Sequence, residues 1–106
     1  MRRQNKYGAK ATILEGRRFA SRREARRYQD LKLLEAAGEI HSLRLQVPYS
    51  LRVGSIEIGK YVADFVYFER ALDREIIEDC KGYRTAMYKW KKRHFEAEYK
   101  TEISET

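Results

Sequence analysis

Two hydrophobic stretches in the second half of the chain, residues 61–68 and 76–82, each carry an acidic residue in their interior. Both are rich in β-branched and aromatic side chains, which predicts strands with regular alternation between two faces. This alternation places Asp79 and Lys81 on the same face of the second strand, while Asp64 lies inside the first. Charged groups within a core strand are costly unless they are paired or bound to a metal. We therefore expect these three side chains to form a site.

The periodicity of the rest of the chain predicts a mixed α/β fold. The expected elements are a small hairpin or a tight bend over 11–19, a helix over 21–37, strands over 43–47 (extendable to 53), 56–68 and 75–81, a second helix over 85–99, and a short strand over 101–103. Gly54 and Ser55 supply a two-residue hairpin turn, and residues 69–73 turn the chain back. The three central strands then form an antiparallel meander, which places Asp64 and Asp79 side by side.

The first helix begins with Ser-Arg-Arg-Glu at 21–24, which fits a capping box with Ser21 at the N-cap and Glu24 three residues later. Glu24 also lies at the edge of the apolar face of this helix. As a cap, it needs no further role. As a third acid, it would point at the same cation as Asp64 and Asp79. The pattern leaves both roles open, and they are compatible.

The second helix carries two apolar lines, one through Met87 and Trp90 and one through Tyr88 and Phe95. Both lines predict contact with the sheet. Lys91 lies between them and points towards the sheet, where it is a candidate for a second substrate cation. The remaining basic residues of this helix form an outer face, for which solvation and phosphate contact are the alternatives.

Positive charge is concentrated at the N-terminal end of the chain. The formal net charge is +7, and residues 1–27 alone carry +8, from ten Lys and Arg residues against Glu15 and Glu24. A basic block on a near-neutral body favours a polyanion partner, most simply nucleic acid. The alternative is a solubilising or disordered tail. We expect a single domain over 1–106 with a basic arm over 1–20.

The remaining composition restricts the class of protein. Hydrophobic residues make up 42% of the chain, which indicates a folded protein, and charged residues make up 37%, which indicates a heavily ionised surface. Cys80 is the only cysteine, so an intrachain disulfide and a Cys-rich zinc site are excluded. No apolar run approaches the ~20 residues that span a bilayer, and the start of the chain lacks the apolar stretch of a signal peptide. We expect a cytoplasmic protein without a membrane partner.

The two aspartates and the lysine have the chemistry of a small metal site. Mg²⁺ is usually held by one or two carboxylates together with waters and substrate phosphates, so Asp64, Asp79 and the main-chain carbonyl of Cys80 would hold it. Lys81 would stabilise the charge that develops on a phosphate under attack. Glu78 is disfavoured as a ligand because it alternates away from Lys81, although a β-bulge would reverse that choice. The alternative interpretation is a structural ion pair between Lys81 and either aspartate.

Together these residues resemble the PD-(D/E)XK nuclease superfamily, whose members have a helix, a three-stranded meander carrying an Asp and a (D/E)-x-Lys tripeptide, a second helix and a final strand. Asp64 matches the first acid, and Asp79-Cys80-Lys81 matches the tripeptide, with Cys80 where an aliphatic residue is more usual. Glu24 matches the first-helix glutamate of many members, including archaeal Holliday-junction resolvases. A closer similarity is to small phage-encoded nucleases of this type. It extends over nearly the whole chain through residues 6–10, the Ser-x-x-Glu-Ala start of the first helix, and residues 38–40, 45–48, 61–65 and 78–82.

The resemblance implies a restriction-endonuclease-like core and an endonuclease that cleaves phosphodiester bonds with Mg²⁺, or with Mn²⁺ as a substitute. Glu24, Asp64, Asp79 and Cys80 would hold the metal, and Lys81 would assist the attack. The implied partners are DNA, especially branched or four-way DNA, and a second copy of the chain in a homodimer. A phage-encoded member would act in the bacterial cytoplasm. The alternatives are a non-catalytic DNA- or junction-binding module on the same fold, a transposase-like or mismatch-type endonuclease, and a purely structural virion protein.

The basic residues expected to contact DNA phosphates lie in the N-terminal arm or on one of the two helices. They are Arg2, Arg3, Lys6, Lys10, Arg17, Arg18, Arg22, Arg23, Lys89, Lys91, Lys92 and Arg93. Such contacts carry little sequence preference and make affinity strongly dependent on salt. Arg22 and Arg23 also occupy the first turn of a helix, where positive charge opposes the helix dipole, and this favours an anion partner there.

Overall fold

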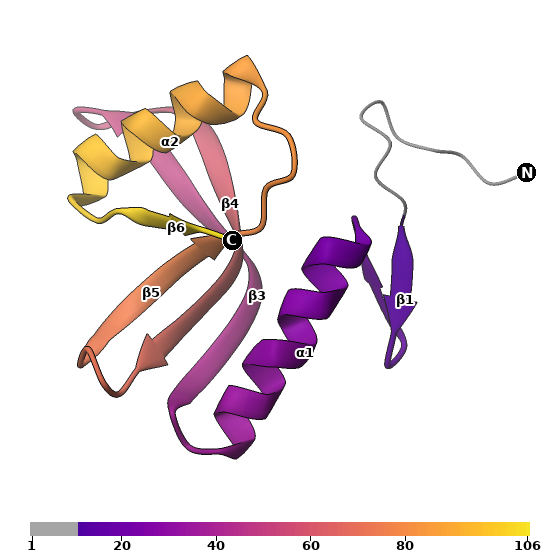
Figure 1. The fold of residues 1–106 in the computed structure, drawn as a ribbon. Coiled ribbons are helices and arrows are strands. Elements are labelled where there is room, and N and C mark those ends of the chain that lie inside the picture. Colours follow the sequence, from indigo (N-terminus) through magenta and orange to yellow (C-terminus); the bar gives the residue numbers. More distant parts are fainter. Residues whose placement is uncertain (1–10) are drawn as a thin grey trace, which may run out of the picture.

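The structure of the protein is a computed structural model that describes residues 11–106 (Figure 1). Its first element is an antiparallel hairpin of β1 (Thr12–Leu14) and β2 (Arg17–Phe19). The connecting residues Glu15 and Gly16 have φ angles of 52° and 77°, which is the left-handed region used in tight turns. Of the hairpin and the tight bend expected at this place, the structure shows the hairpin.

A four-stranded sheet forms the centre of the protein. In spatial order it consists of β3 (Ile40–Val53), β4 (Ile56–Glu69), β5 (Arg74–Asp79) and β6 (Ile103–Glu105). The pairs β3–β4 and β4–β5 are antiparallel, as expected for the meander, and β6 runs parallel to β5. Gly54 occupies the predicted tight turn with φ 59°. The fold is therefore mixed α/β with a mostly antiparallel sheet.

The strand boundaries differ from the prediction in three places. β3 begins at Ile40 instead of residue 43, and it takes the longer of the two predicted ends, because Pro48 is tolerated in a strand at the edge of the sheet. The closing strand begins at Ile103 instead of residue 101. β5 ends at Asp79, so Lys81 follows the strand instead of belonging to it, and its N–H donates to the carbonyl of Thr106 over 3.2 Å. Lys81 therefore stands at the end of the sheet.

The two helices are α1 (Arg22–Ala36) and α2 (Ala86–Tyr99). The predicted start of α1 is confirmed, because Oγ of Ser21 accepts a 3.2 Å hydrogen bond from the N–H of Glu24. Its end is also as predicted, with Gly38 in the left-handed conformation at φ 79°. No helix within the described range is long and apolar enough to cross a membrane.

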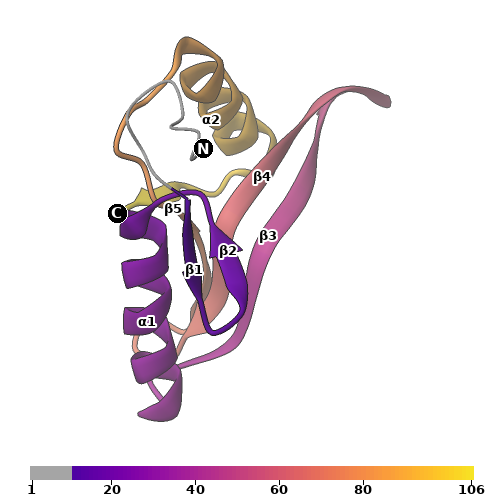
Figure 2. The ribbon, with the colours of Figure 1, turned by 90° about the vertical axis from the view of Figure 1, so that its right-hand side faces the viewer.

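The hydrophobic core divides into two clusters, one for each helix. The α1 core consists of Phe19, Ala25, Tyr28, Leu31, Ile40, Phe65, Tyr67 and Ile76. The α2 core consists of Leu51, Tyr61, Ala63, Val66, Ile77, Tyr88, Phe95 and Ile103. Figures 1 and 2 show α1 alongside one half of the twisted sheet and α2 alongside the other half. The two long strands β3 and β4 therefore contribute to both cores.

Side-chain alternation along β4 changes phase around Asp64. Ala63 and Val66 belong to the α2 core, although they are three residues apart, whereas Phe65 and Tyr67 belong to the α1 core. In a regular strand, side chains three positions apart, such as those of Ala63 and Val66, point to opposite faces of the sheet. The regular alternation expected along this strand is therefore wrong. Asp64 thus lies at the junction between the two cores.

Only one of the two apolar lines of α2 is buried. Tyr88 and Phe95 belong to the α2 core, whereas Met87 and Trp90 are 62% and 48% exposed. The prediction that both lines contact the sheet is therefore wrong for Met87 and Trp90. Lys91, expected to point towards the sheet, is half-buried.

Candidate functional site

Asp64 and Asp79 are neighbours at the end of the β4–β5 pairing. Phe65 pairs with Glu78, so the next position in the same register places Asp64 opposite Asp79. The main-chain N–H of Cys80 donates a 2.9 Å hydrogen bond to Oδ2 of Asp64 and fixes this carboxylate. Metal ligation by the carbonyl of Cys80 stays a prediction.

Asp79 is fully buried, at 0% exposure. The hydroxyl of Tyr61 donates a 2.5 Å hydrogen bond to its Oδ2, and Nζ of Lys81 lies 3.0 Å from its Oδ1. Among the described residues, none forms a hydrogen bond of good geometry with Oδ1. The pKa of Asp79 is raised to about 7, chiefly by burial and then by Asp64, whereas Tyr61 and Lys81 oppose the rise. Tyr61 and Lys81 thus do not fully offset the unfavourable effect of burial and of Asp64 on the charged form of Asp79.

Lys81 contacts the buried Asp79 and is itself partly exposed to solvent. Its side chain is 28% exposed, and its ammonium group lies 4.5 Å from the centroid of the Tyr88 ring. The ring face favours the cation and limits the positions that the ammonium group can take. The ion pair of Lys81 with Asp79, considered above as a structural alternative, is present, and its lysine is partly exposed to solvent.

Glu24 lies in the first turn of α1 and also reaches the aspartates. Its Oε2 accepts a 3.3 Å hydrogen bond from the N–H of Ala20, one residue before the N-cap. Its Oε1 accepts a 2.9 Å hydrogen bond from the side-chain amide of Gln46. Burial raises the pKa of Glu24, while hydrogen bonds with Ala20 and Asp64 oppose the rise. Ser21 is the N-cap as predicted, but the side chain of Glu24 accepts from Ala20 instead of Ser21, so only half of the predicted capping box forms. Metal ligation by Glu24 stays a prediction.

Gln46 is a member of the site that the sequence did not reveal. The same Nε2 atom that donates to Glu24 also lies 3.2 Å from Oδ1 of Asp64. Gln46 has φ 52°, an uncommon conformation for a residue other than Gly, and it lies between the pairs Leu45–Phe65 and Val47–Ala63. In the hydropathy pattern it is an ordinary polar position of an alternating strand. The pattern gives no sign of the left-handed backbone conformation that Gln46 adopts or of the two acids that its amide contacts.

Glu78 is engaged on the other side of β5. It is fully buried and accepts two hydrogen bonds from Arg27, of 2.7 and 3.0 Å, and one of 2.6 Å from the hydroxyl of Tyr67. The hydroxyl of Thr106 adds a fourth, of 3.2 Å. The structure therefore places Asp79, and not Glu78, with Lys81, as the strand period predicted.

The donor chemistry of the cluster suits a hard divalent cation. Glu24, Asp64 and Asp79 offer carboxylate oxygens, and Oδ1 of Asp79 is buried without a hydrogen bond. However, no three His, Cys, Asp or Glu side chains within residues 11–106 are already arranged as a metal-binding group. The amide of Gln46 lies between two of the carboxylates. The donor types thus suit Mg²⁺, but these carboxylates would have to move closer together to hold it.

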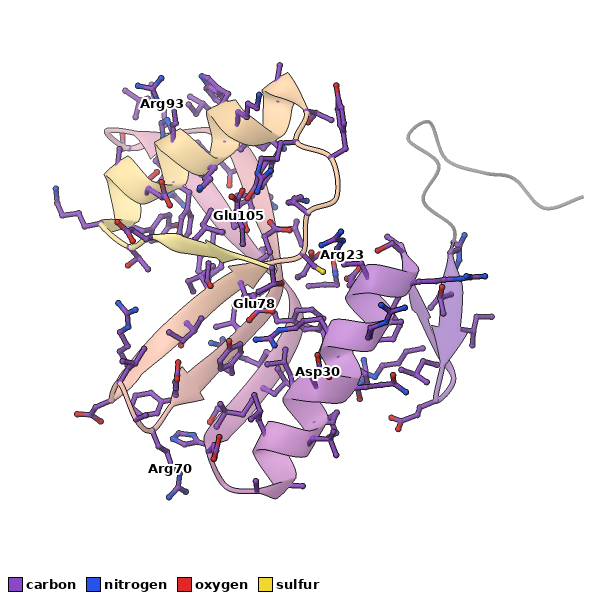
Figure 3. All side chains as sticks on the ribbon, viewed as in Figure 1. Arg23, Asp30, Arg70, Glu78, Arg93 and Glu105 are labelled. Carbon is purple, nitrogen blue, oxygen red and sulfur yellow. The ribbon has the colours of Figure 1, made fainter. Side chains whose placement is uncertain are left out.

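The residues predicted to contact DNA fall into separate groups. Those on β2 and the first turn of α1 are exposed: Arg17, Arg18, Arg22 and Arg23. Those on α2 are exposed or half-buried: Lys89, Lys91, Lys92 and Arg93. Figure 3 shows Arg23 between α1 and the end of the sheet, and Arg93 well away from it on the outer side of α2. Four more lie outside the described residues: Arg2, Arg3, Lys6 and Lys10. DNA contact by each of these residues stays a prediction.

Comparison with known proteins places the chain in a family without giving it an activity. A family model described as a protein of unknown function (DUF1064) matches residues 4–105. No curated protein matches the chain, and no solved structure does.

Proposed function

The chain belongs to the DUF1064 family of proteins of unknown function, and we propose that it is a metal-dependent DNA endonuclease of the PD-(D/E)XK type. One observation carries the proposal. Glu24 from α1, Asp64 from β4, and Asp79 and Lys81 from the end of β5 converge on one cluster, linked by Gln46 and by the Asp79–Lys81 ion pair. The order of helix, antiparallel meander, helix and final strand is also that of a restriction-endonuclease-like core.

The three acids would hold Mg²⁺, or Mn²⁺ in its place, with Asp64 and Asp79 as the principal ligands. When bound, the metal would polarise a phosphodiester and lower the pKa of a water molecule. Two hydrogen bonds within the protein hold the carboxylates of Asp64 and Asp79 in position. Cys80 holds Asp64 through its main-chain N–H, and Tyr61 holds one oxygen of Asp79.

Lys81 would bind the phosphate and stabilise the negative charge that develops during attack. Its ammonium group lies 3.0 Å from Asp79 and its side chain is partly exposed, so it would be able to contact a phosphate held near that carboxylate. A role in charge stabilisation suits Lys81 better than proton abstraction, because an acid lies 3.0 Å from its Nζ.

The proposed substrate is DNA, and specifically branched recombination or replication intermediates bound by a homodimer. Support comes from the exposed arginines of β2 and of the first turn of α1, among which Arg23 lies close to Gly82, and from the +8 charge of residues 1–27. A second candidate is a non-catalytic junction-binding module on the same fold. The Lys81–Asp79 ion pair favours it, because that pair already gives the two residues a structural role.

Cleavage of four-way, flap and linear DNA with Mg²⁺ or Mn²⁺ tests the proposal. We expect wild-type protein to cut at least one of these substrates, and Asp79→Asn to reduce cutting by about 100-fold or more while it still binds DNA in EDTA. Asp73→Asn is the matched control, because Asp73 is exposed in the β4–β5 turn and its φ of 51° is tolerated by Asn. Wild-type protein that binds junctions and cuts none of the three substrates would favour the binding module.

A further inference from the structure

A pocket lies near the acid cluster, on the side of β5 where Arg27 pairs with Glu78. It is open to solvent, has a volume of about 420 Å³, and is lined by Arg23, Arg26, Arg27, Asp30, Cys80 and Thr106. We refer to these six residues as the arginine pocket. Figure 3 shows Arg23 and Asp30 on α1 and Glu78 on the facing sheet. The pocket thus lies between α1 and the end of the sheet.

The three arginines follow one another at helical spacing, so a single face of α1 presents them to the pocket. Arg27 is already paired with Glu78 through two hydrogen bonds. Arg23 and Arg26 have no ion pair within residues 11–106, and Asp30 is the only acid that lines the pocket there. Positive charge therefore remains available to an anion.

Two residues connect this pocket to the acid cluster. Cys80 lines the pocket, and its main-chain N–H holds Asp64. Gly82 follows Lys81 directly, and a Cβ atom at Gly82 would lie 3.8 Å from Nε of Arg23. An anion in the pocket would therefore be a close neighbour of a phosphate bound at Asp64 and Lys81.

We propose that the arginine pocket binds a backbone phosphate of the DNA strand that is cut, beside the phosphate at the acid cluster. This inference rests on the proposed function. Guanidinium groups bind phosphate oxygens with two parallel hydrogen bonds, and Arg23 and Arg26 are the two arginines with free donors for this. The hydroxyl of Thr106 adds a further polar group at the pocket wall. Arg27 contributes charge but is held in place by Glu78.

The salt dependence of DNA binding in EDTA tests this inference without requiring cleavage. Each phosphate contact that is lost should lower the slope of log K against log salt by about 1. We expect this loss in Arg23→Ala and in Arg26→Ala. Arg26→Lys keeps the charge but lacks the two-pronged donor, so it should restore the slope while recovering affinity only in part. Arg70→Ala is the control, because Arg70 is exposed far from the pocket (Figure 3).

Slopes of Arg23→Ala and Arg26→Ala that match the slope of Arg70→Ala would overturn the inference. A phosphate at a strand end has the same chemistry as an internal one, so duplexes with 5′-phosphate ends, 5′-hydroxyl ends and closed hairpin ends are compared. An effect seen with all three supports an internal phosphate, and an effect confined to 5′-phosphate ends contradicts it. Failure of the nuclease proposal appears separately, as wild-type protein that binds DNA without cutting it.

Discussion

The hydroxyl of Tyr61 and the carboxylate of Asp79 form a buried hydrogen bond of 2.5 Å between β4 and β5. Tyr61 donates its proton, so the bond stabilises the charged form of Asp79. Burial and the nearby Asp64 favour the protonated form more strongly, and the pKa of Asp79 is therefore about 7 in spite of this bond. Tyr61 thus moderates how strongly Asp79 holds its proton.

Replacement of Tyr61 by Phe should raise the pKa of Asp79 further. The protein should also lose about 1–3 kcal/mol of stability at pH 8, where the carboxylate is charged, and less at pH 5, where it is protonated. An NMR titration of the Asp side-chain carboxyl signals and urea unfolding at both pH values measure the two effects. Tyr67→Phe is the matched control, because it removes a 2.6 Å hydrogen bond to Glu78 on the same strand pair without touching Asp79. An equal shift in both variants would contradict the assignment.

The raised pKa of Asp79 predicts how stability depends on pH in EDTA. The native protein keeps a proton on Asp79 up to about pH 7, whereas the unfolded chain releases it near 3.8. The native state therefore binds more protons between these values, and the free energy of unfolding should fall as the pH rises from about 4 to 7, by a few kcal/mol from Asp79. Burial of Glu24 acts in the same direction.

Asp79→Asn isolates the contribution of Asp79, because Asn does not titrate. Both proteins are unfolded with urea from pH 4 to 8. The unfolding free energy of Asp79→Asn, relative to that of the wild type, should increase as the pH rises and level off above about pH 7. A difference that does not change with pH would mean that Asp79 is ionised throughout this range.

Elements fixed by neighbouring residues could be predicted from the sequence. The capping residue Ser21 and the turn residue Gly54 act within a few positions, so the start of α1 and the β3–β4 turn followed from local patterns. The meander then brought Asp64 and Asp79 together.

Features that depend on tertiary packing could not be predicted in the same way. The hydropathy pattern does not predict the left-handed backbone conformation of Gln46. The change in side-chain alternation near Asp64 arises because residues of one strand, β4, pack into two different cores. Arg27 and Glu78 pair across 51 positions of the chain. The two apolar lines of α2 have equal periodicity, and only the position of the sheet decides that Trp90 stays exposed.

Glu78 should be needed for folding and not for metal binding. Glu78→Ala leaves the guanidinium group of Arg27 without its partner and should destabilise the protein by about 3 kcal/mol, with the partial exposure of Arg27 limiting the loss. Glu78→Gln keeps the shape and acceptor oxygen and should cost less. Chemical denaturation measures both effects. Loss of Mn²⁺ binding by Glu78→Gln at unchanged stability would instead identify Glu78 as a ligand.

Gln46 should act by positioning Glu24 and Asp64, because its amide donates to both carboxylates. Removal of such an outer partner typically reduces metal affinity or activity by about 10–100-fold. We expect that loss in Gln46→Ala, measured as Mn²⁺ affinity by calorimetry and as cleavage in single-turnover conditions. Gln46→Gly also lacks the amide but accepts φ 52° without strain, so it should be more stable than Gln46→Ala and equally impaired in metal affinity. Full metal affinity in Gln46→Gly would show that the site needs the backbone conformation and not the amide.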